Sequence, residues 1–188
     1  YTCSYCVKTV IQKYYGFEDA SKKGALIKAK KYLRSKSAKR IYEELKFYKE
    51  NLGIQLVRCQ DTNFLTIDPK VLKELEVLNI NEPLEIKLYI ETRPEGINEK
   101  SVKLLKNLGV DGVGMGIELA GEEFRENELN RFADQDKIIN AFKLLKDNGI
   151  NWTSYNIIGL PNQTESSIIS TIKFNKILNP DNITVAFY

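Results

Sequence analysis

LEIKLYIE, which runs from Leu84 to Glu91, alternates apolar and polar residues, and this period of two predicts a β-strand. The next stretch, NEKSVKLLKNL from Asn98 to Leu108, repeats its apolar residues at the period of a helix and is ended by a glycine. A glycine-rich run, GVGMGI from Gly112 to Ile117, then predicts a second strand. Strand, helix and strand joined by short links predict a right-handed βαβ unit with parallel strands.

The same unit recurs along the rest of the chain. Capping and turn residues predict helix starts at Ser37, Asp68-Pro69, Asp134 or Gln135, and Thr164. Short apolar runs predict further strands over Ile54 to Cys59, Trp152 to Ile158 and Ile183 to Tyr188. The alternation of helix and strand predicts an α/β fold with a mainly parallel sheet. A Rossmann sheet would carry GxGxxG after its first strand, but the glycines at 112–116 lie inside a strand, which favours a (β/α) barrel.

The composition is that of an ordinary globular domain. The chain has 188 residues, 43% apolar and 28% charged, which suffices for one domain with a substantial core. It holds no apolar run long enough to cross a membrane. The formal net charge of +3 does not support nucleic-acid binding. The lysine-rich run from Lys22 to Lys49 is typical of a solvated helix face, with a surface for an anionic partner as the alternative, and Ser21 to Tyr32 within it predicts loop or irregular helix.

Two of the three cysteines form a CxxC pair, Cys3 and Cys6, at the start of the chain. Three cysteines in a chain of this length do not make a disulfide framework, so the pair indicates metal binding or redox chemistry in a reducing cytoplasm. The absence of histidine excludes Ser-His-Asp and Cys-His catalysis and any zinc site with a histidine ligand. A zinc site, a thioredoxin-type redox pair and an iron–sulfur cluster remain open. Because so dense a motif begins at residue one, we expect the chain to start inside its own active-site loop.

Polar and turn residues gather where each predicted strand ends. In a parallel barrel these carboxyl ends line the mouth of the active site. The residues at these ends are Cys59, Asp61, Asn63 and Phe64; Glu91, Thr92, Arg93 and Pro94; Glu118; and Gly159, Leu160, Pro161, Gln163 and Thr164. The sequence therefore predicts one site, shared with the CxxC pair.

At these positions the chain resembles the radical S-adenosylmethionine (SAM) enzymes, and most closely their cobalamin-binding group with its methylthiotransferase-like relatives. The CxxC pair, with Tyr5 before its second cysteine, is similar to the second half of that family's CxxxCxxC loop. The other matching segments are Gln60 to Phe64, Thr92 to Pro94, Gly114 to Glu118, Phe124-Arg125 with Leu129 to Arg131, and Ile158 to Pro161. The resemblance implies one core domain over residues 1–188. Its fold would be a partial TIM-type (β/α) barrel of about six parallel strands, with the first strand upstream of this chain.

The resemblance also implies the cofactors and the activity. Cys3 and Cys6 would be two of the three thiolate ligands of a 4Fe–4S cluster, with the third ligand upstream of Tyr1. The open iron would bind SAM, whose reductive cleavage yields a 5′-deoxyadenosyl radical. An external electron donor such as flavodoxin or ferredoxin would supply the electron, and a cobalamin domain would lie upstream. Methyl or methylthio transfer is the expected reaction, the substrate stays unnamed, and the chain as given is expected to be inactive and without an intact cluster.

Each part of SAM has candidate ligands by the same resemblance. The adenine would lie against Tyr5, Ile158 and Gly159. Glu118 would accept hydrogen bonds from the ribose hydroxyls.

The methionine carboxylate would pair with Arg93 or Arg125, because a guanidinium matches the two oxygens of a carboxylate. Asp61 and Asn63 would lie near the methionyl end. For Arg125 and Arg131 the alternative is a local ion pair with a nearby glutamate, Glu122, Glu123 or Glu126.

Other functions remain open at this stage. One alternative is a non-catalytic (β/α) scaffold or binding domain, and a weaker one is a zinc-binding protein that uses Cys3 and Cys6.

Cys59 is more typical of a small buried residue than of a ligand. Without its first strand, the sheet would have an open edge through which chains could associate.

Overall fold

The structure is a computed structural model that describes residues 3–16 and 34–188. The first two residues and the stretch from Ser21 to Tyr32, for which a loop or an irregular helix is predicted, lie outside the described residues. In chain order the elements are α1 (Val7–Tyr14), α3 (Ala38–Leu52), β1 (Leu56–Arg58), a 3-10 helix (Phe64–Thr66), α4 (Pro69–Asn81), β2 (Lys87–Thr92), a second 3-10 helix (Pro94–Gly96), α5 (Glu99–Asn107), β3 (Val110–Glu118), α6 (Glu122–Leu129), α7 (Gln135–Asp147), β4 (Asn151–Ile158), α8 (Glu165–Leu178) and β5 (Asn182–Phe187).

Local chemistry sets where the helices begin. The side chain of Ser37 accepts a hydrogen bond from the backbone of Arg40 at the start of α3, and Thr164 does the same for α8. Asp68 caps α4, with Pro69 at the first helical position, where a missing N–H costs nothing. These predicted helix starts are confirmed.

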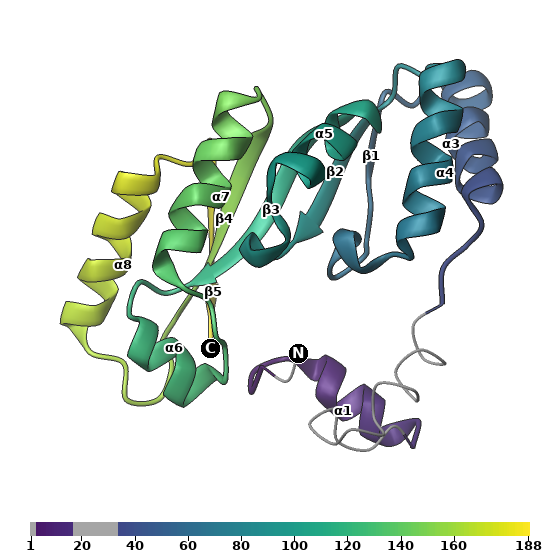
Figure 1. Cartoon of the computed structure of the whole chain (residues 1–188). Coiled ribbons are helices and arrows are strands. Elements are labelled where there is room, and N and C mark those ends of the chain that lie inside the picture. The colour runs from purple at the N-terminus through teal and green to yellow at the C-terminus, as the bar shows by residue number, and fades with distance from the viewer. Residues whose placement is uncertain (1–2, 17–33) are drawn as a thin grey trace.

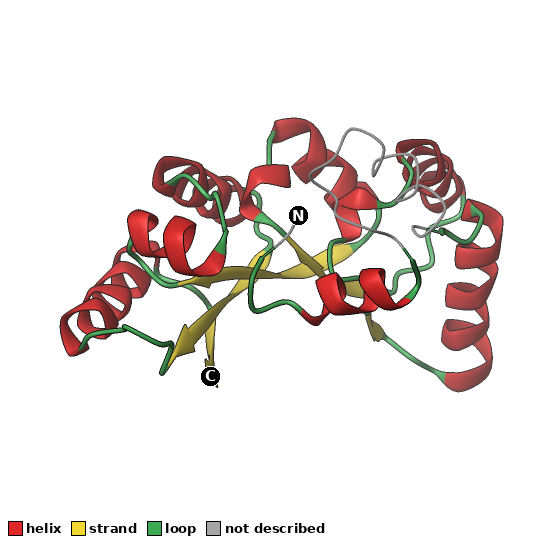
Figure 2. Cartoon of the chain, turned by 90° about the horizontal axis from the view of Figure 1, so that it is seen from below, coloured by secondary structure: helices red, strands yellow, loops and turns green. Residues whose placement is uncertain are grey.

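The five strands form one parallel sheet in which the spatial order equals the chain order. Figure 1 shows α3 and α4 near the β1 end of this sheet and α8 near the other end. The helices lie around the strands, as the second view shows (Figure 2), and the sheet curls into a half-barrel. The predicted partial (β/α) barrel with five strands in this chain is confirmed. Strand β1 is shorter than predicted, because only Leu56, Val57 and Arg58 pair with β2.

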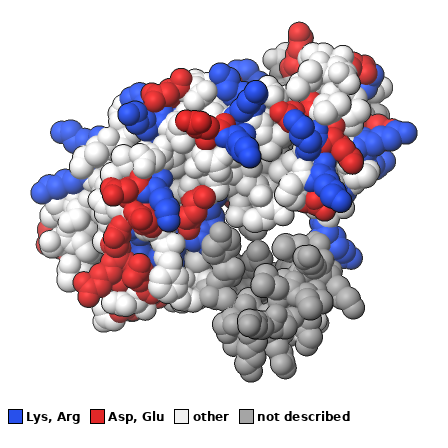
Figure 3. Space-filling view, viewed as in Figure 1, with Lys and Arg blue, Asp and Glu red and all other residues white. Residues whose placement is uncertain are grey.

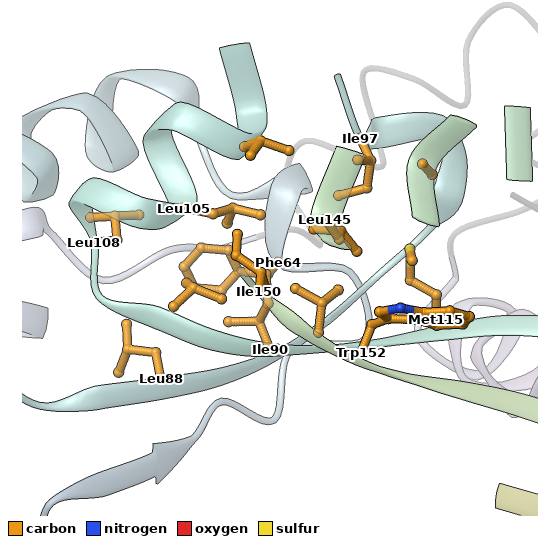
Figure 4. Close-up of a cluster of buried hydrophobic side chains, with 14 of the residues drawn as sticks. Phe64, Leu88, Ile90, Ile97, Leu105, Leu108, Met115, Leu145, Ile150 and Trp152 are labelled. Carbon is orange, nitrogen blue, oxygen red and sulfur yellow. The ribbon is translucent and has the colours of Figure 1, made fainter. Parts of the chain in front are cut away.

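The core fills the space between the sheet and its helices (Figure 4). Alternate residues of β2 and β3, among them Ile90 and Met115, face Leu105 of α5 and Leu145 of α7, and all four are buried. Burying each such side chain contributes about 1.5–3 kcal/mol. A slip of one residue would turn the whole apolar set to the other face, so this pattern fixes the register of the sheet.

The concave face of β3 carries glycine at alternate positions, Gly112, Gly114 and Gly116. Their partners in the neighbouring strands are Tyr89 for Gly112 and Tyr155 for Gly116. Because β3 presents no side chain there, long side chains from β2 and β4 can lie across it.

The N-terminal loop is held against the end of α6, a helix that the sequence analysis did not predict. The backbone N–H of Ser4 donates to the carbonyl of Leu129 at 3.0 Å, and the Ser4 hydroxyl donates to the carbonyl of Glu128 at 2.6 Å. Figure 1 shows the N-terminal segment and α6 at the same end of the molecule. These two bonds place the CxxC pair beside the carboxyl end of β3.

The described part of the lysine-rich run behaves as a solvated helix face. Lys36, just before α3, and Arg40, in its first turn, are exposed and pair with the half-buried Glu44. Acidic side chains gather instead at the position of α6 (Figure 3), whose first turn holds Glu122 and Glu123. None of the described helices has the length and apolar character that crossing a bilayer requires.

Candidate active site

A cavity of about 200 Å³ opens at the carboxyl ends of the strands. Its walls come from the CxxC loop, the segment after β1, and strands β2, β3 and β4. The lining residues are Cys3, Tyr5, Cys6, Thr62, Asn63, Thr66, Glu91, Thr92, Arg93, Gly114, Gly116, Glu118, Arg131 and Tyr155. Six predicted site residues are therefore brought together here: Cys3, Tyr5, Cys6, Asn63, Arg93 and Glu118.

The two cysteines stand on one tight turn. The backbone N–H of Cys6 donates to the carbonyl of Cys3 at 3.1 Å, and neither cysteine forms a disulfide within the described residues. Cys3 is buried and Cys6 half-buried, and both reach the cavity. Among the residues that the structure describes, no three histidine, cysteine or acidic side chains converge as a metal site. Cys59 lies elsewhere, and its burial beside Asp61 raises the pKa of its thiol to about 11, so it is a neutral thiol at physiological pH.

Glu118 ends β3 in an unusual conformation. Its φ of 66° lies in the left-handed region, which non-glycine residues adopt at a cost of about 1–3 kcal/mol and which is concentrated at functional sites. The side chain folds back over Gly116, where a Cβ would meet Oε1 of the carboxylate. Tyr5 donates its phenol hydrogen to Oε1 at 2.7 Å. Burial raises the pKa of Glu118, and the nearby Arg131 and Tyr5 oppose that rise.

Arg131 is the buried cation of the cavity. Its guanidinium donates to the carbonyl of Gly116 and lies 3.8 Å from Oε1 of Glu118. Its Nε is buried without a hydrogen-bond partner in the described structure. Such an atom costs about 1–3 kcal/mol unless a ligand or water satisfies it, so Arg131 is suited to an anionic group in the cavity.

The segment after β2 forms the opposite wall. Thr92 donates its hydroxyl hydrogen to the side-chain oxygen of Asn63 at 2.8 Å, which ties the β1 segment to β2. Arg93 is buried and pairs with Glu95 at 2.8 Å. Arg93 therefore reaches the cavity as a cation that is already partly neutralised.

Two tyrosines meet on the concave face of the sheet. The hydroxyls of Tyr89 and Tyr155 lie 3.0 Å apart across β3, over Gly112 and Gly114. Glu91 accepts a hydrogen bond from Arg58 at 2.6 Å and one from Tyr155 at 3.3 Å. Through Glu91 and Tyr155 this polar wall continues the cavity away from the cysteines.

Arg125 does not reach the cavity. Its side chain is fully buried, and its guanidinium donates to the carbonyls of Leu119 at 2.6 Å, Ala120 at 3.0 Å and Ala133 at 2.7 Å. It also lies 3.8 Å from Glu122, the local ion pair that was the alternative. The arginine thus holds together the two ends of the α6 segment, and its predicted role toward a carboxylate stays a prediction without support from its position.

Three other predicted residues also lie outside this cavity. Asp61 is exposed and lines a separate cavity beside Cys59. Ile158 lines a groove between α8 and β5, and the backbone N–H of Gly159 donates to the side chain of Gln163 at 2.7 Å. The neighbouring Leu160 and Pro161 line a cavity of about 230 Å³ with Ser4, Tyr5, Glu128, Leu129 and Tyr188. The segment after β4 is therefore close to Tyr5, on the side away from the cysteines' cavity.

Sequence reasoning missed the lining residue Tyr155. It placed Glu91 among the strand-end residues, and Gly114, Gly116 and Arg131 in the matching segments, without naming them as ligands. The glycines carried a usable signal, since alternate glycines in a strand indicate the close approach of other groups. Arg131 carried none, because the sequence does not tell which of two arginines in one short segment turns inward.

Comparisons with known proteins agree with this arrangement. The model of the Radical SAM superfamily matches residues 1–174. An uncharacterized methyltransferase from Pyrococcus horikoshii is 30% identical over 148 residues, which are 79% of this chain and 32% of that protein. The anaerobic magnesium-protoporphyrin IX monomethyl ester cyclase of Rubrivivax gelatinosus is 32% identical over 111 residues, 58% of this chain and 20% of the cyclase. The chain thus spans a third or less of the length of these relatives.

Solved structures show the same fold. The radical S-adenosylmethionine methyltransferase TsrM from Kitasatospora setae, solved with cobalamin and a [4Fe-4S] cluster, superposes with a TM-score of 0.72 at 16% identity, over 81% of this chain and 31% of that one. The coproporphyrinogen III oxidase HemN of Escherichia coli, a radical SAM enzyme, superposes with a TM-score of 0.64 at 21% identity. The match covers 80% of this chain and 37% of HemN. With the family model covering residues 1–174, the chain belongs to the Radical SAM superfamily.

Proposed function

We propose that this chain is the core domain of a radical SAM enzyme and that residues 1–188 form most of it. In this proposal Cys3, Cys6 and a third thiolate outside the chain hold a 4Fe–4S cluster beside bound SAM. One observation carries it: both cysteines, Glu118 and Arg131 open on a single cavity at the carboxyl ends of the strands.

The residues present fit these groups. Thiolates are the usual ligands of iron–sulfur clusters, and two cysteines of one turn, which form no disulfide within the described residues, line the cavity. The buried, unpartnered Nε of Arg131 lies in the same wall. The cluster supplies the electron that cleaves SAM reductively, and every other role falls to the protein.

Those roles are binding and orientation. Arg131 and Arg93, which both line the cavity, would supply positive charge for the methionine carboxylate, and Asn63 of the same lining would lie near that end. Glu118 offers acceptor oxygens to the ribose hydroxyls. Tyr5 and the segment after β4, which includes the predicted Ile158 and Gly159, remain the proposed region for the adenine.

For the reaction we propose methyl transfer. The Pyrococcus relative named a methyltransferase and the fold shared with TsrM support it. A cobalamin domain in the whole protein is part of the same proposal. So are an external electron donor, such as flavodoxin or ferredoxin, and a reducing cytoplasm, which suits cysteines that form no disulfide within the described residues.

Anaerobic reconstitution of the full-length protein tests the cluster. We expect roughly four iron and four sulfide per chain, and 5′-deoxyadenosine or a methylated product from SAM and a reductant. Cys3→Ser and Cys6→Ser should each lose the cluster, whereas Cys59→Ser, which removes a neutral thiol elsewhere, should keep it. A cluster that survives Cys3→Ser, or a preparation that takes up zinc and no iron, would contradict the proposal.

A further inference from the structure

The two oxygens of the Glu118 carboxylate have different surroundings. Oε1 accepts the Tyr5 hydroxyl at 2.7 Å and lies 3.8 Å from the guanidinium of Arg131. No hydrogen-bond donor of the described residues reaches Oε2. Because the carboxyl lines the cavity, Oε2 is the oxygen that a ligand can meet.

The orientation of this carboxylate depends on Tyr5. The strained backbone at Glu118 and the missing side chain at Gly116 let the carboxylate fold back over β3, but neither fixes its rotation. The phenol of Tyr5 does so, because a hydrogen bond to a charged acceptor is both strong and directional.

Tyr5 is itself held from two sides. Its ring packs against a small apolar cluster made of Leu119, Leu129 and Leu160. The preceding residue, Ser4, is tied to the end of α6 by two hydrogen bonds. The phenol oxygen is therefore fixed relative to β3 by the same loop that carries Cys3 and Cys6.

From this geometry we infer that Tyr5 is a positioning residue for the ribose of SAM: its hydroxyl holds Oε1 of Glu118 so that Oε2 accepts from the ribose diol. The inference rests on the proposed function and adds a coupling to it. Order in the cysteine loop sets ribose recognition, and a bound ribose in turn stabilises the loop, because coupling between two binding events is reciprocal.

The test measures equilibrium binding of SAM and of its 2′-deoxy and 3′-deoxy analogues to the reconstituted full-length protein. The parent protein should prefer SAM over the deoxy analogues by about tenfold or more, because the analogues leave Oε2 without a donor. Tyr5→Phe keeps the ring in its apolar cluster and removes the hydroxyl. This substitution should weaken the binding of SAM about tenfold and leave the iron content unchanged. It should also reduce the ratio of affinities for SAM and its deoxy analogues to near one.

Two further variants separate positioning from folding. Tyr42→Phe removes another partly buried hydroxyl, which donates to the carbonyl of Glu82 at 2.7 Å away from the cavity, and should keep the full preference. Glu118→Gln by itself should abolish the preference for SAM over its deoxy analogues. Adding Tyr5→Phe to this variant should not change the affinities further.

Each other outcome counts against the inference. Tyr5→Phe could weaken the binding of SAM and of the deoxy analogues by the same factor, or leave the preference for SAM intact. In either case Tyr5 only packs, and the inference is wrong while the proposed function stands. If the parent protein loads a cluster but binds no SAM, the proposed function and the inference both fail.

Discussion

Gly114 has no room for a side chain. A Cβ there would lie 2.7 Å from Cζ of Tyr155, whose ring crosses β3 at this point. We predict that Gly114→Ala forces the ring away and breaks the contact between the hydroxyls of Tyr155 and Tyr89. Overpacking of this kind should lower the free energy of unfolding by about 1–3 kcal/mol, measured by urea denaturation.

A double-mutant cycle provides the control for this prediction. Tyr155→Ala removes the clashing ring, so Gly114→Ala should cost much less in that background than in the parent chain. Equal costs in both backgrounds would show that Tyr155 is not what excludes a side chain from Gly114.

Single residues show what the sequence could supply at the site. Cys3, Cys6 and Glu118 were predictable because the motif and the strand end are local in sequence. The choice between Arg125 and Arg131 was not, since the two lie six residues apart on either side of a left-handed turn at Asn130, with a φ of 47°, and only Arg131 lines the cavity. Side-chain direction after a helix end is a tertiary property.

At the scale of elements, Glu76 joins α4 to the end of α5. Its carboxylate is 7% exposed and accepts hydrogen bonds from Lys73 at 2.6 Å and from Asn107 at 2.7 Å. These bonds lower the pKa of Glu76 below its ordinary 4.5. The stability that they contribute is therefore present above that value and is lost as the pH falls through the lowered pKa.

We predict that Glu76→Gln costs about 1–2 kcal/mol at neutral pH and that the difference from the parent chain disappears once the pH has fallen through the lowered pKa of Glu76. Urea denaturation across this range measures it. Glu74→Gln, at an exposed position of the same helix, should cost little at any pH. A Glu76→Gln cost that persists unchanged in acid would show that shape, not charge, is what matters there.

Elements with strong local signals were predictable. The caps at Ser37, Asp68 and Thr164 and the stop at Gly149 are chemistry that a single residue carries. Helix α6 was missed because its sequence, EEFRENEL, has no apolar stripe and its fully buried arginine donates to backbone carbonyls outside the helix.

Helix α8 shows the opposite difficulty. Its isoleucines predict an apolar face, yet Ile172 is 64% and Ile177 72% exposed, while Asn175 is buried. The buried face combines the apolar Phe174 and Leu178 with polar residues, among them Asn175, which bonds to Ser154 and Asn156 of β4. Hydropathy alone cannot distinguish a buried amide network from a solvated face.

At the scale of the whole molecule, the sheet has two outer strands, β1 and β5, that pair on one side only within the part of the chain that the structure describes. Unpaired backbone groups on such edges favour association with another sheet. We therefore predict that this chain associates in solution through β1, seen as a concentration-dependent sedimentation coefficient. Leu56→Lys, which places a charge on the 53% exposed Leu56 of β1, should shift it toward the monomer.

The matched control is Ile80→Lys, because Ile80 is 54% exposed on helix α4 and does not belong to an edge strand. It should leave the association unchanged. Equal effects of the two substitutions would point to general hydrophobic contact, and a monomer at all concentrations would contradict edge pairing.

Trp152 adds a practical consequence of the fold. It is the chain's single tryptophan, it is 2% exposed, and its ring stacks on Phe142 of α7 with centroids 3.8 Å apart. Trp152 is therefore an intrinsic fluorescent probe of the packing between β4 and α7. While α7 packs on β4, its fluorescence emission is that of an indole shielded from water. The packing that supports Tyr155, three residues further along β4, can therefore be followed by tryptophan fluorescence without a label.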